Sequence, residues 1–550
     1  MNGPLAAAAF GAAFFVWVHG LDVLHPGHID WLMRSDWRFQ FLGWQYFRQE
    51  PWAWPPGLIA GYNRAPLGSA IGLTDSVPLM AFALKPLSGA LPMPFQYIGA
   101  WLLLCFALHG ALGALIVRLW SRSPVVQAMG GATFVLMPTL LNRTLHPALC
   151  AQWLVLWAIL IYCSHRSGAP VRRLPLVACG AVAGLVHPYL AVMVLAIEVA
   201  FVARLALQDG WDAAARAADA AALALVAMAC GWWASGLLSL PATALAREGL
   251  TVFSMNVLGP VSPSGWSAWL PEQPIGAAGQ GFEGFQYLGA GVLALAALGT
   301  AFAVRRIPQR AWVAALPLAA VSVALALYAL SPRVTLGGRV LVDYQAPWLE
   351  AWFGMLRVTG RFFWPAAYSL LALSLGAVLS TLRPTVGSLV VGAALVLQAA
   401  DLHPGFAMRR ADAHAPAARR WFYPFRSTAW DRILAPYAHL ALILPPQCGA
   451  TPVPFEAAAY LASLHGLSVN AGEQSRWDAD QAGAYCDGFR AAIAARQFDR
   501  ATLYLLYPPY RPHVLPGSTL FCGTLDGMQV CAEEATVSPW RALVAPLPDE

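Results

Sequence analysis

The sequence predicts an all-α polytopic membrane domain followed by a C-terminal soluble α/β domain. Of the 550 residues, 58% are hydrophobic and 11% are charged, and the mean hydropathy is +0.56. Soluble globular proteins carry roughly 25% charged residues, so this composition excludes a disordered chain and indicates a multi-pass membrane protein. The long apolar runs end near residue 402, and a more polar segment of different pattern follows them.

Apolar runs near 20 residues are the main signal, because a helix of that length spans a bilayer. We expect about eleven transmembrane helices, at 4–21, 94–118, 124–141, 145–163, 174–187, 188–206, 218–241, 286–304, 311–330, 363–382 and 386–402. The first run has no basic residue before it, so we expect a retained span rather than a cleaved signal peptide. His187-Pro188 interrupts residues 174–206, which therefore form one kinked span or two spans joined by a tight turn.

Arginine placement predicts the orientation. With the N-terminus in the cytoplasm, the inner loops hold most of the loop arginines, which is the positive-inside pattern. Domain 1–402 then has long outer loops at 22–93, 242–285 and 331–362, and domain 403–550 lies on the same outer side. The net charge is +6, but the basic residues are scattered, without an arginine-rich run interleaved with aromatic residues. We therefore expect no nucleic-acid partner.

The outer C-terminal domain shows a β-α-β-α-β order, which predicts a small α/β sheet. We expect strands and helices, in turn, at 440–444, 455–465, 468–470, 478–496 and 501–507. A hairpin follows, because Asp526-Gly527 is a favoured two-residue turn.

Four of the nine cysteines lie in this outer domain, which predicts two disulfides in an oxidising compartment. The hairpin register places Cys522 opposite Cys531 in a non-hydrogen-bonded pair, about 4.5 Å apart at Cα, which suits a disulfide. Cys448–Cys486 follows by elimination. A zinc site is the alternative, but the CxxC spacing typical of zinc sites does not occur.

The first outer loop is the segment richest in candidate chemistry. Ser35 suits the N-cap of a helix starting near Asp36, and aromatic residues at helical spacing predict an amphipathic helix on the membrane surface. Asp36 is then a catalytic candidate or only a helix-start carboxylate that complements the dipole. His25, His28 and Asp30 form a weak candidate metal site, with solvated loop histidines as the alternative.

Two further residues of this loop carry functional groups. Asp75, in a Thr-Asp-Ser-Val segment, is a pocket candidate, although Thr74 or Asp75 could instead cap a helix that starts near Val77. Lys85 is the single lysine of the chain. It could bind a phosphate as a point charge, or extend to a lipid headgroup.

Other polar side chains fall near the outer ends of predicted spans, and they are Asn142, Arg143, His146, His187, Tyr189, Glu283, Tyr287, Arg357 and Arg361. If Arg357 and Arg361 are helical, their spacing puts both on one face, where they suit a phosphate or diphosphate. Interfacial anchoring is the alternative. Glu198 lies within a span, where an acid indicates function or a pair with a neighbour such as Arg204.

The order of several segments resembles a family of bacterial membrane proteins of unknown function, placed near the GT-C superfamily of glycosyltransferases. The matching segments are SDWRFQFLGWQYFRQEPW, TDSVPLMAFALKP, NRTLHPAL, HPYLAVM, FEGFQYLGAGVLAL and LRVTGRFFWP. They cover the first 365 residues, and the outer tail fits the family as well. The sequence contains no P-loop, GxSxG, HExxH or Rossmann fingerprint.

The GT-C resemblance implies an inverting transferase that moves a sugar from a polyprenyl-phosphate donor to a glycan, lipid or protein acceptor. It implies an essential carboxylate in the first outer loop, which falls on Asp36, with Asp30 second. The carboxylate takes the acceptor proton, and cations stabilise the departing phosphate. These cations are Lys85, Arg357 and Arg361, with Arg48 behind them. The remaining pocket candidates are Asp75, His146, His187, Tyr189 and Glu283.

Some GT-C members carry a DxD or ExD pair, which is not present around Asp36. Dependence on a divalent metal, Mg or Mn, therefore stays open. The resemblance also implies the bacterial inner membrane, with the C-terminal domain in the periplasm and the lipid bilayer as a partner. Two other functions stay open: a flippase or transporter for a lipid-linked sugar, and a non-catalytic partner in glycan assembly. A transporter is disfavoured because the sequence shows no pair of broken helices that recurs in two halves of the chain.

Overall fold

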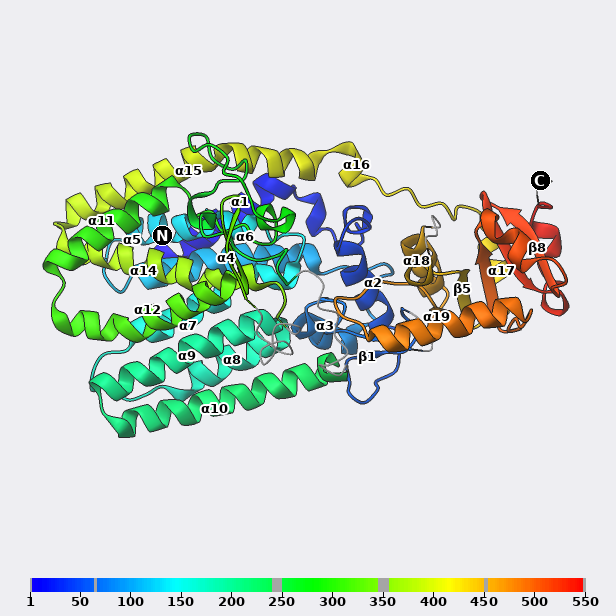
Figure 1. Cartoon of the computed structure of the whole chain (residues 1–550), viewed down its shortest axis with the longest axis horizontal. Helices are drawn as coiled ribbons and strands as arrows, with labels where there is room; N and C mark the ends of the chain where they lie inside the picture. Colours follow the sequence, from blue (N-terminus) through cyan, green and yellow to red (C-terminus); the bar gives the residue numbers. More distant parts are fainter. Residues whose placement is uncertain (1, 64–66, 240–249, 345–355, 450–453, 548–550) are drawn as a thin grey trace. The chain divides into compact units, whose positions relative to one another are not determined.

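The computed structural model describes residues 2–63, 67–239, 250–344, 356–449 and 454–547 (Figure 1). The chain divides into two compact units. Unit 1 holds residues 1–25, 97–232 and 247–416, and unit 2 holds residues 26–96, 233–246 and 417–550. The first outer loop thus belongs to the same compact unit as the C-terminal domain, although 320 residues separate the two in sequence.

Unit 1 is mostly helical. Its helices are α1 (Gly3–His19), α4 (Ile98–Val117), α5 (Pro124–Val135), α6 (Pro138–Leu141), α7 (Trp153–Ser164), α8 (Arg173–Val186), α9 (Pro188–Gln208), α10 (Trp211–Ala234), α11 (Ala290–Arg306), α12 (Gln309–Ala329), α14 (Trp364–Thr381) and α15 (Pro384–His414). A hairpin of β3 (Arg333–Leu336) and β4 (Arg339–Asp343) follows α12. Every predicted apolar run coincides with helix, and seven of the described helices are long and apolar enough to cross a membrane. The count of eleven spans stays a prediction.

Small residues allow close helix packing in unit 1. A side chain at Gly11 of α1 would overlap the carbonyl of Phe106 in α4, and one at Gly110 of α4 would overlap the carbonyl of Ala7. Such close approach is typical of helix pairs in membranes, where van der Waals packing replaces the hydrophobic effect. The α1–α4 pair is therefore held by backbone proximity that larger residues would prevent.

The interrupted region 174–206 forms two helices, α8 and α9, rather than one kinked span. His187 separates them with an extended backbone, and its Nδ1 accepts a bond from Tyr189 N at 3.2 Å, which caps α9. The C-terminal end of α9 is bonded to the segment that precedes α8. Asp209 accepts hydrogen bonds from Ser167 Oγ at 2.5 Å and from Gly168 N at 2.9 Å. Figure 1 shows the two helices side by side.

Unit 2 contains the predicted α/β sheet. Five strands lie in the order β6-β5-β7-β9-β8, with β5, β6 and β7 parallel and β8–β9 a hairpin. The elements are β5 (His439–Ile443), α18 (Phe455–Leu464), β6 (Ser468–Val469), α19 (Ala479–Ala494), β7 (Thr502–Leu506), β8 (Leu520–Leu525) and β9 (Met528–Glu533), with the short helices α16 (Pro416–Arg419), α17 (Ala429–Leu434) and α20 (Arg511–Val514). All five predicted elements and the hairpin are confirmed, with shifts of only one or two residues at most ends.

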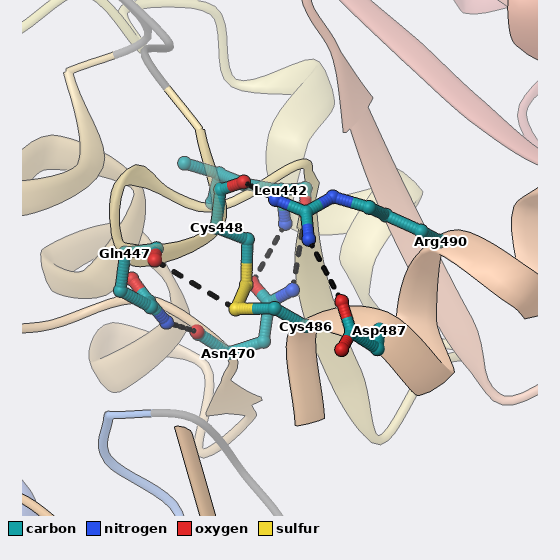
Figure 2. Close-up of a disulfide and its surroundings, with 7 residues drawn as sticks. All are labelled: Leu442, Gln447, Cys448, Asn470, Cys486, Asp487 and Arg490. Atoms are coloured by element: carbon teal, nitrogen blue, oxygen red, sulfur yellow. Dashed lines mark hydrogen bonds and ion pairs between the residues drawn. A yellow bond between two sulfur atoms is a disulfide. The ribbon is translucent and has the colours of Figure 1, made fainter. Parts of the chain in front are cut away.

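Both predicted disulfides are present. Cys522 lies opposite Cys531 in the β8–β9 register, with their Cα atoms 4.1 Å apart. Cys448 is bonded to Cys486 of α19 (Figure 2). Beside that bond, the Asn470 amide accepts from Leu442 N and donates to Leu442 O, at 2.8 and 3.1 Å, and so extends the sheet by a side chain.

The first outer loop supplies the rest of unit 2 with α2 (Trp37–Phe47), β1 (Leu58–Ile59), β2 (Ser69–Ala70) and α3 (Pro78–Leu84). The predicted helix is present, but its predicted amphipathic character and surface position are wrong. Nearly every residue of α2 is buried, because α2 packs against α18 and its polar groups find partners inside unit 2. Arg38 pairs with both carboxylate oxygens of Glu473 at 2.8 and 3.0 Å, and Tyr46 donates to Ala459 O at 2.9 Å.

Candidate functional site

Asp36 directly precedes α2 and is half-buried. It occupies the N-cap position that the sequence assigned to Ser35, but its side chain makes no capping bond to the helix. Asp30 begins a short 3-10 helix, Asp30–Leu32, and is also half-buried. Burial raises the pKa of Tyr460 to about 12, with a smaller contribution from Asp30, so Asp30 lies within electrostatic reach of α18.

The segment that carries Asp75 lies against the first turn of α2. Ser76 Oγ donates to Gln40 O at 2.6 Å and shares a hydrogen bond of 2.8 Å with Thr74 Oγ1. Neither Thr74 nor Asp75 caps α3, whose N-cap is Val77 without a side-chain bond. The structure therefore brings the Asp75 segment against the helix that Asp36 precedes.

This segment is strained. Asp75 has φ +52° and Val77 has φ +48°, in the left-handed region that a β-branched residue rarely adopts. Each such residue costs about 1–3 kcal/mol and persists only where surrounding contacts impose it. The bonds of Ser76 are such contacts, and strain of this kind is concentrated at functional sites.

Lys85 follows α3 in a cage of aromatic rings. Its Nζ lies 3.8 Å from the ring centre of Phe47 and 4.5 Å from that of Trp52, and the residue is 6% exposed. Within the described ranges, Nζ has no hydrogen-bond partner. Burial lowers the pKa of Lys85 to about 8, an effect that the charge of Glu50 partly offsets. The cation is thus held by rings, and its three donors are not used by the fold.

Arg48 has a structural role in place of the predicted phosphate contact. It donates to the carbonyl oxygens of Pro92, Ser88 and Leu91 at 2.9 to 3.0 Å, and it packs over the rings of Trp44 and Phe95. These bonds join the end of α2 to the chain after α3. Arg48 is therefore committed to holding unit 2 together.

In unit 1, a buried ion cluster joins side chains from three separate loops. Glu283 Oε2 lies 2.6 Å from Arg143 Nη1, and 3.0 Å from both Nε and Nη2 of Arg361. His146 Nε2 lies 3.8 Å from the other carboxylate oxygen. All four residues are at most 9% exposed. The sequence placed each near the outer end of a predicted span, and the structure brings them together.

Glu283 is an anchor for these cations. Burial alone would raise the pKa of its carboxyl, but Arg143, Arg361 and His146 together hold that pKa well below its usual range. The carboxylate is therefore ionised, and it is unsuited to act as a base at neutral pH. A third guanidinium, that of Arg409, binds Asn142 beside the cluster and adds a positive charge.

The other sequence candidates near this cluster have mixed roles. Tyr189 lies under Arg361, at 5.0 Å from ring centre to guanidinium, and its hydroxyl accepts from Val358 N at 2.9 Å. His187 is the helix cap described above. Arg357 and Arg361 would share a face only if both were helical, and Arg357 instead precedes the short 3-10 helix Thr359–Phe363.

Glu198 does not pair with Arg204. Both of its carboxylate oxygens are buried and, among the described residues, have no hydrogen-bond partner. Arg204 instead donates to Tyr162 O at 2.5 Å, His165 O at 3.0 Å and the side chain of Gln208. The two residues are six apart, which places them on different faces of α9.

Metal-binding geometry is not found in the described ranges: no group of three or more His, Cys, Asp or Glu side chains is placed to hold an ion. His25, His28 and Asp30 are described residues, and they do not form such a group.

Sequence reasoning missed one buried acid. Asp401 of α15 is 0% exposed and accepts from Tyr287 Oη at 2.6 Å, Ala290 N at 2.8 Å and the hydroxyl of Ser267. It fixes the outer segment before α11 to α15. An acid at the end of an apolar run was the available signal.

Two family models match this sequence and show the family to which it belongs. The model described as "Domain of unknown function (DUF6311)" matches residues 8–403, and the DUF6311 C-terminal domain matches residues 429–533. The chain belongs to the DUF6311 family. No curated protein matches the sequence of this DUF6311 protein significantly.

Solved structures place this DUF6311 protein in a known fold. It is similar to ArnT from Cupriavidus metallidurans bound to undecaprenyl phosphate, with a TM-score of 0.50 and 14% identity over 95% of this chain and 97% of that one. The Archaeoglobus fulgidus oligosaccharyltransferase tethered with an acceptor peptide gives a TM-score of 0.41 and 11% identity, over 85% of this chain and 64% of that one. The likeness to ArnT over the full length shows a GT-C fold, as the sequence predicts.

Proposed function

We propose that this DUF6311 protein is a membrane glycosyltransferase that takes a sugar from a polyprenyl-phosphate donor at the periplasmic face of the bacterial inner membrane. The acceptor is a surface glycan, a lipid or a protein. The ArnT structure contains undecaprenyl phosphate, and its likeness to this chain extends over both chains almost completely. The two disulfides fit an oxidising compartment such as the periplasm.

The buried cluster at Glu283 is the observation that carries this proposal. Arg143 and Arg361 bring two positive charges to the single carboxylate of Glu283, and Arg409, which has Asp412 near it, lies beside them. An anionic ligand would add negative charge beside these guanidinium groups, and charge-assisted hydrogen bonds to them would favour its binding. Planar guanidinium groups suit the oxygens of a phosphate, and Glu283 holds two of them in fixed orientations.

The proposed reaction needs one base and a stabilised leaving group. Asp36 takes the proton from the acceptor hydroxyl as its oxygen attacks the anomeric carbon, with Asp30 as the second candidate. The bond from that carbon to the phosphate oxygen breaks, and polyprenyl phosphate leaves with the electron pair. Cations stabilise the departing phosphate, and the candidates are Lys85 in unit 2, or Arg361 with Arg143 and Arg357 in unit 1. The anomeric centre is inverted by this single displacement.

The lipids of a deletion strain test this function. Loss of a periplasmic transferase leaves its lipid-linked sugar unused, so that sugar accumulates and is accessible to a membrane-impermeant oxidant such as periodate in spheroplasts. Loss of a flippase leaves the sugar on the cytoplasmic leaflet, where periodate does not reach it. A non-catalytic partner is indicated if Asp36→Asn, expressed at the normal level, leaves no lipid-linked sugar unused. Either of these last results contradicts the proposal.

A further inference from the structure

A cavity of about 450 Å³ opens in unit 1 between the carboxyl-terminal ends of α4 and α7, away from the cluster at Glu283. Leucines from both helices form its apolar wall, and they are Leu115, Leu119 and Leu160. Trp120 forms another side, with its ring against Gly376 of α14, where a side chain would collide with the indole. The apolar wall is thus built by packed elements.

The polar wall of this cavity carries two arginines, Arg118 and Arg166, together with Ser164. In the part of the chain that the structure describes, neither guanidinium takes part in a hydrogen bond, an ion pair or a ring contact. The nearby acid Asp209 is already bonded to His165, Ser167 and Gly168. The described lining of the cavity therefore holds two positive charges and no acidic side chain.

The positive-inside pattern predicts the cytoplasmic membrane surface for these helix ends. An apolar wall beside two arginines at that depth matches a lipid, whose acyl chains are apolar and whose phosphate is negative. Basic pockets between transmembrane helices on the cytoplasmic side bind anionic headgroups in this way. Ser164 Oγ donates to Ile161 O at 3.1 Å, so its lone pairs are available to accept from a headgroup hydroxyl.

We propose that this cavity binds an anionic glycerophospholipid of the cytoplasmic leaflet. Its phosphate lies between Arg118 and Arg166, a glycerol hydroxyl donates to Ser164, and the acyl chains follow Leu115 and Leu160. The site is independent of the proposed transfer reaction, because its residues belong to the opposite ends of the helices.

Native mass spectrometry of the full chain in detergent micelles, titrated with phosphatidylglycerol, tests this proposal. Each arginine near an anionic headgroup contributes about a fivefold change in affinity. The Arg118→Gln/Arg166→Gln variant should therefore bind phosphatidylglycerol roughly 25-fold more weakly. Arg122→Gln is the control, since Arg122 carries the same charge four residues beyond Arg118 in the same connection but does not line the cavity. Its affinity should remain near that of the unaltered chain.

A second variant guards against misfolding of the first. Ser164→Trp fills the cavity without changing the charge, and Ser164 is exposed, so folding should tolerate the substitution. It should also lose the lipid. Equal retention by Arg118→Gln/Arg166→Gln and Arg122→Gln overturns the proposal. Phosphatidylcholine bound as tightly as phosphatidylglycerol overturns it too, and displacement of the lipid by millimolar inorganic phosphate assigns the site to a free anion instead.

Discussion

The carboxylate of Glu283 lies 2.6 Å from Arg143 Nη1, and both side chains are almost fully buried. The pair connects the segment after α6 to the segment before α11, and Arg361 joins it from the segment before α14. A single carboxylate therefore fixes the loops at one end of three helices. That role gives the cluster two testable properties, one in stability and one in anion binding.

Removing the carboxylate should destabilise unit 1 strongly. Glu283→Gln removes the carboxylate that two buried guanidinium groups share, and the loss of one partner of a buried ion pair costs about 3–5 kcal/mol. Chemical unfolding of the purified chain in detergent measures the change. Glu272→Gln is the control, since Glu272 is exposed in the same outer loop, and it should change stability by less than about 0.5 kcal/mol. An equal effect of both variants would refute the anchoring role.

Acid should lower the contribution of the Glu283 cluster to stability over a defined pH range. Since folding lowers the pKa of Glu283, its contribution to stability is complete above the unfolded value of 4.5. That contribution is lost as the pH falls through the lower, folded value. The Glu283→Gln variant should therefore show a shallower loss of stability below about pH 4.5 than the unaltered chain.

Polyprenyl phosphate should stabilise the unaltered chain. A ligand that binds the folded state at 100 times its Kd adds about 2.7 kcal/mol, which raises the melting temperature. Arg361→Gln should reduce that shift, because one guanidinium of the cluster is lost. A polyprenol without phosphate is the control and should produce no shift. Stabilisation that is the same for the alcohol and the phosphate would rule out the cluster as an anion site.

Lys85 should titrate at an unusually low pH. Burial among rings lowers its pKa from 10.5 to about 8, so between these values the unfolded chain binds the extra proton and stability rises with pH. Lys85 is the single lysine in the sequence, so NMR of a chain labelled with 13C-lysine gives one signal whose titration reads this pKa. Glu50→Gln should lower the value further. A midpoint near 10.5 would show that Lys85 is not buried.

The two disulfides should differ in their contribution to stability. The Cys448–Cys486 bond spans 38 residues and the Cys522–Cys531 bond spans 9, so loop-closure entropy predicts losses of about 4 and 2.5 kcal/mol on their removal. Paired Cys→Ala variants, unfolded in denaturant, measure the two losses. The expected order is a larger loss for the bond in Figure 2, and the reverse order would argue against the entropic account.

Much of the fold followed from local sequence patterns. The apolar runs located the helices, and the Asp526-Gly527 turn fixed the register that pairs Cys522 with Cys531. The spacing of apolar residues and the residue types of a turn involve only a few neighbouring positions. Helices and hairpins can therefore be predicted from them without a structure. The burial of α2 could not be read in this way, because it depends on Arg38 meeting Glu473, some 430 residues along the chain.

The candidate site was predicted in part for the same reason. Arg143, His146, Glu283 and Arg361 stood out as polar groups at the ends of apolar runs, and the structure joins them. Their individual roles depend on contacts between loops. Glu283 proved to be a partner of arginines, whereas Arg48 proved to hold backbone carbonyls.

The release of polyprenyl phosphate by the purified chain tests the central claim most directly. Lipid-linked sugars extracted from the deletion strain serve as donor, and surface material from the same strain serves as acceptor. The unaltered chain should release polyprenyl phosphate as the sugar is transferred. Asp36→Asn should be slower by about 100-fold or more, as expected for the loss of a general base. No release by the unaltered chain, or equal release by Asp36→Asn, would contradict the account.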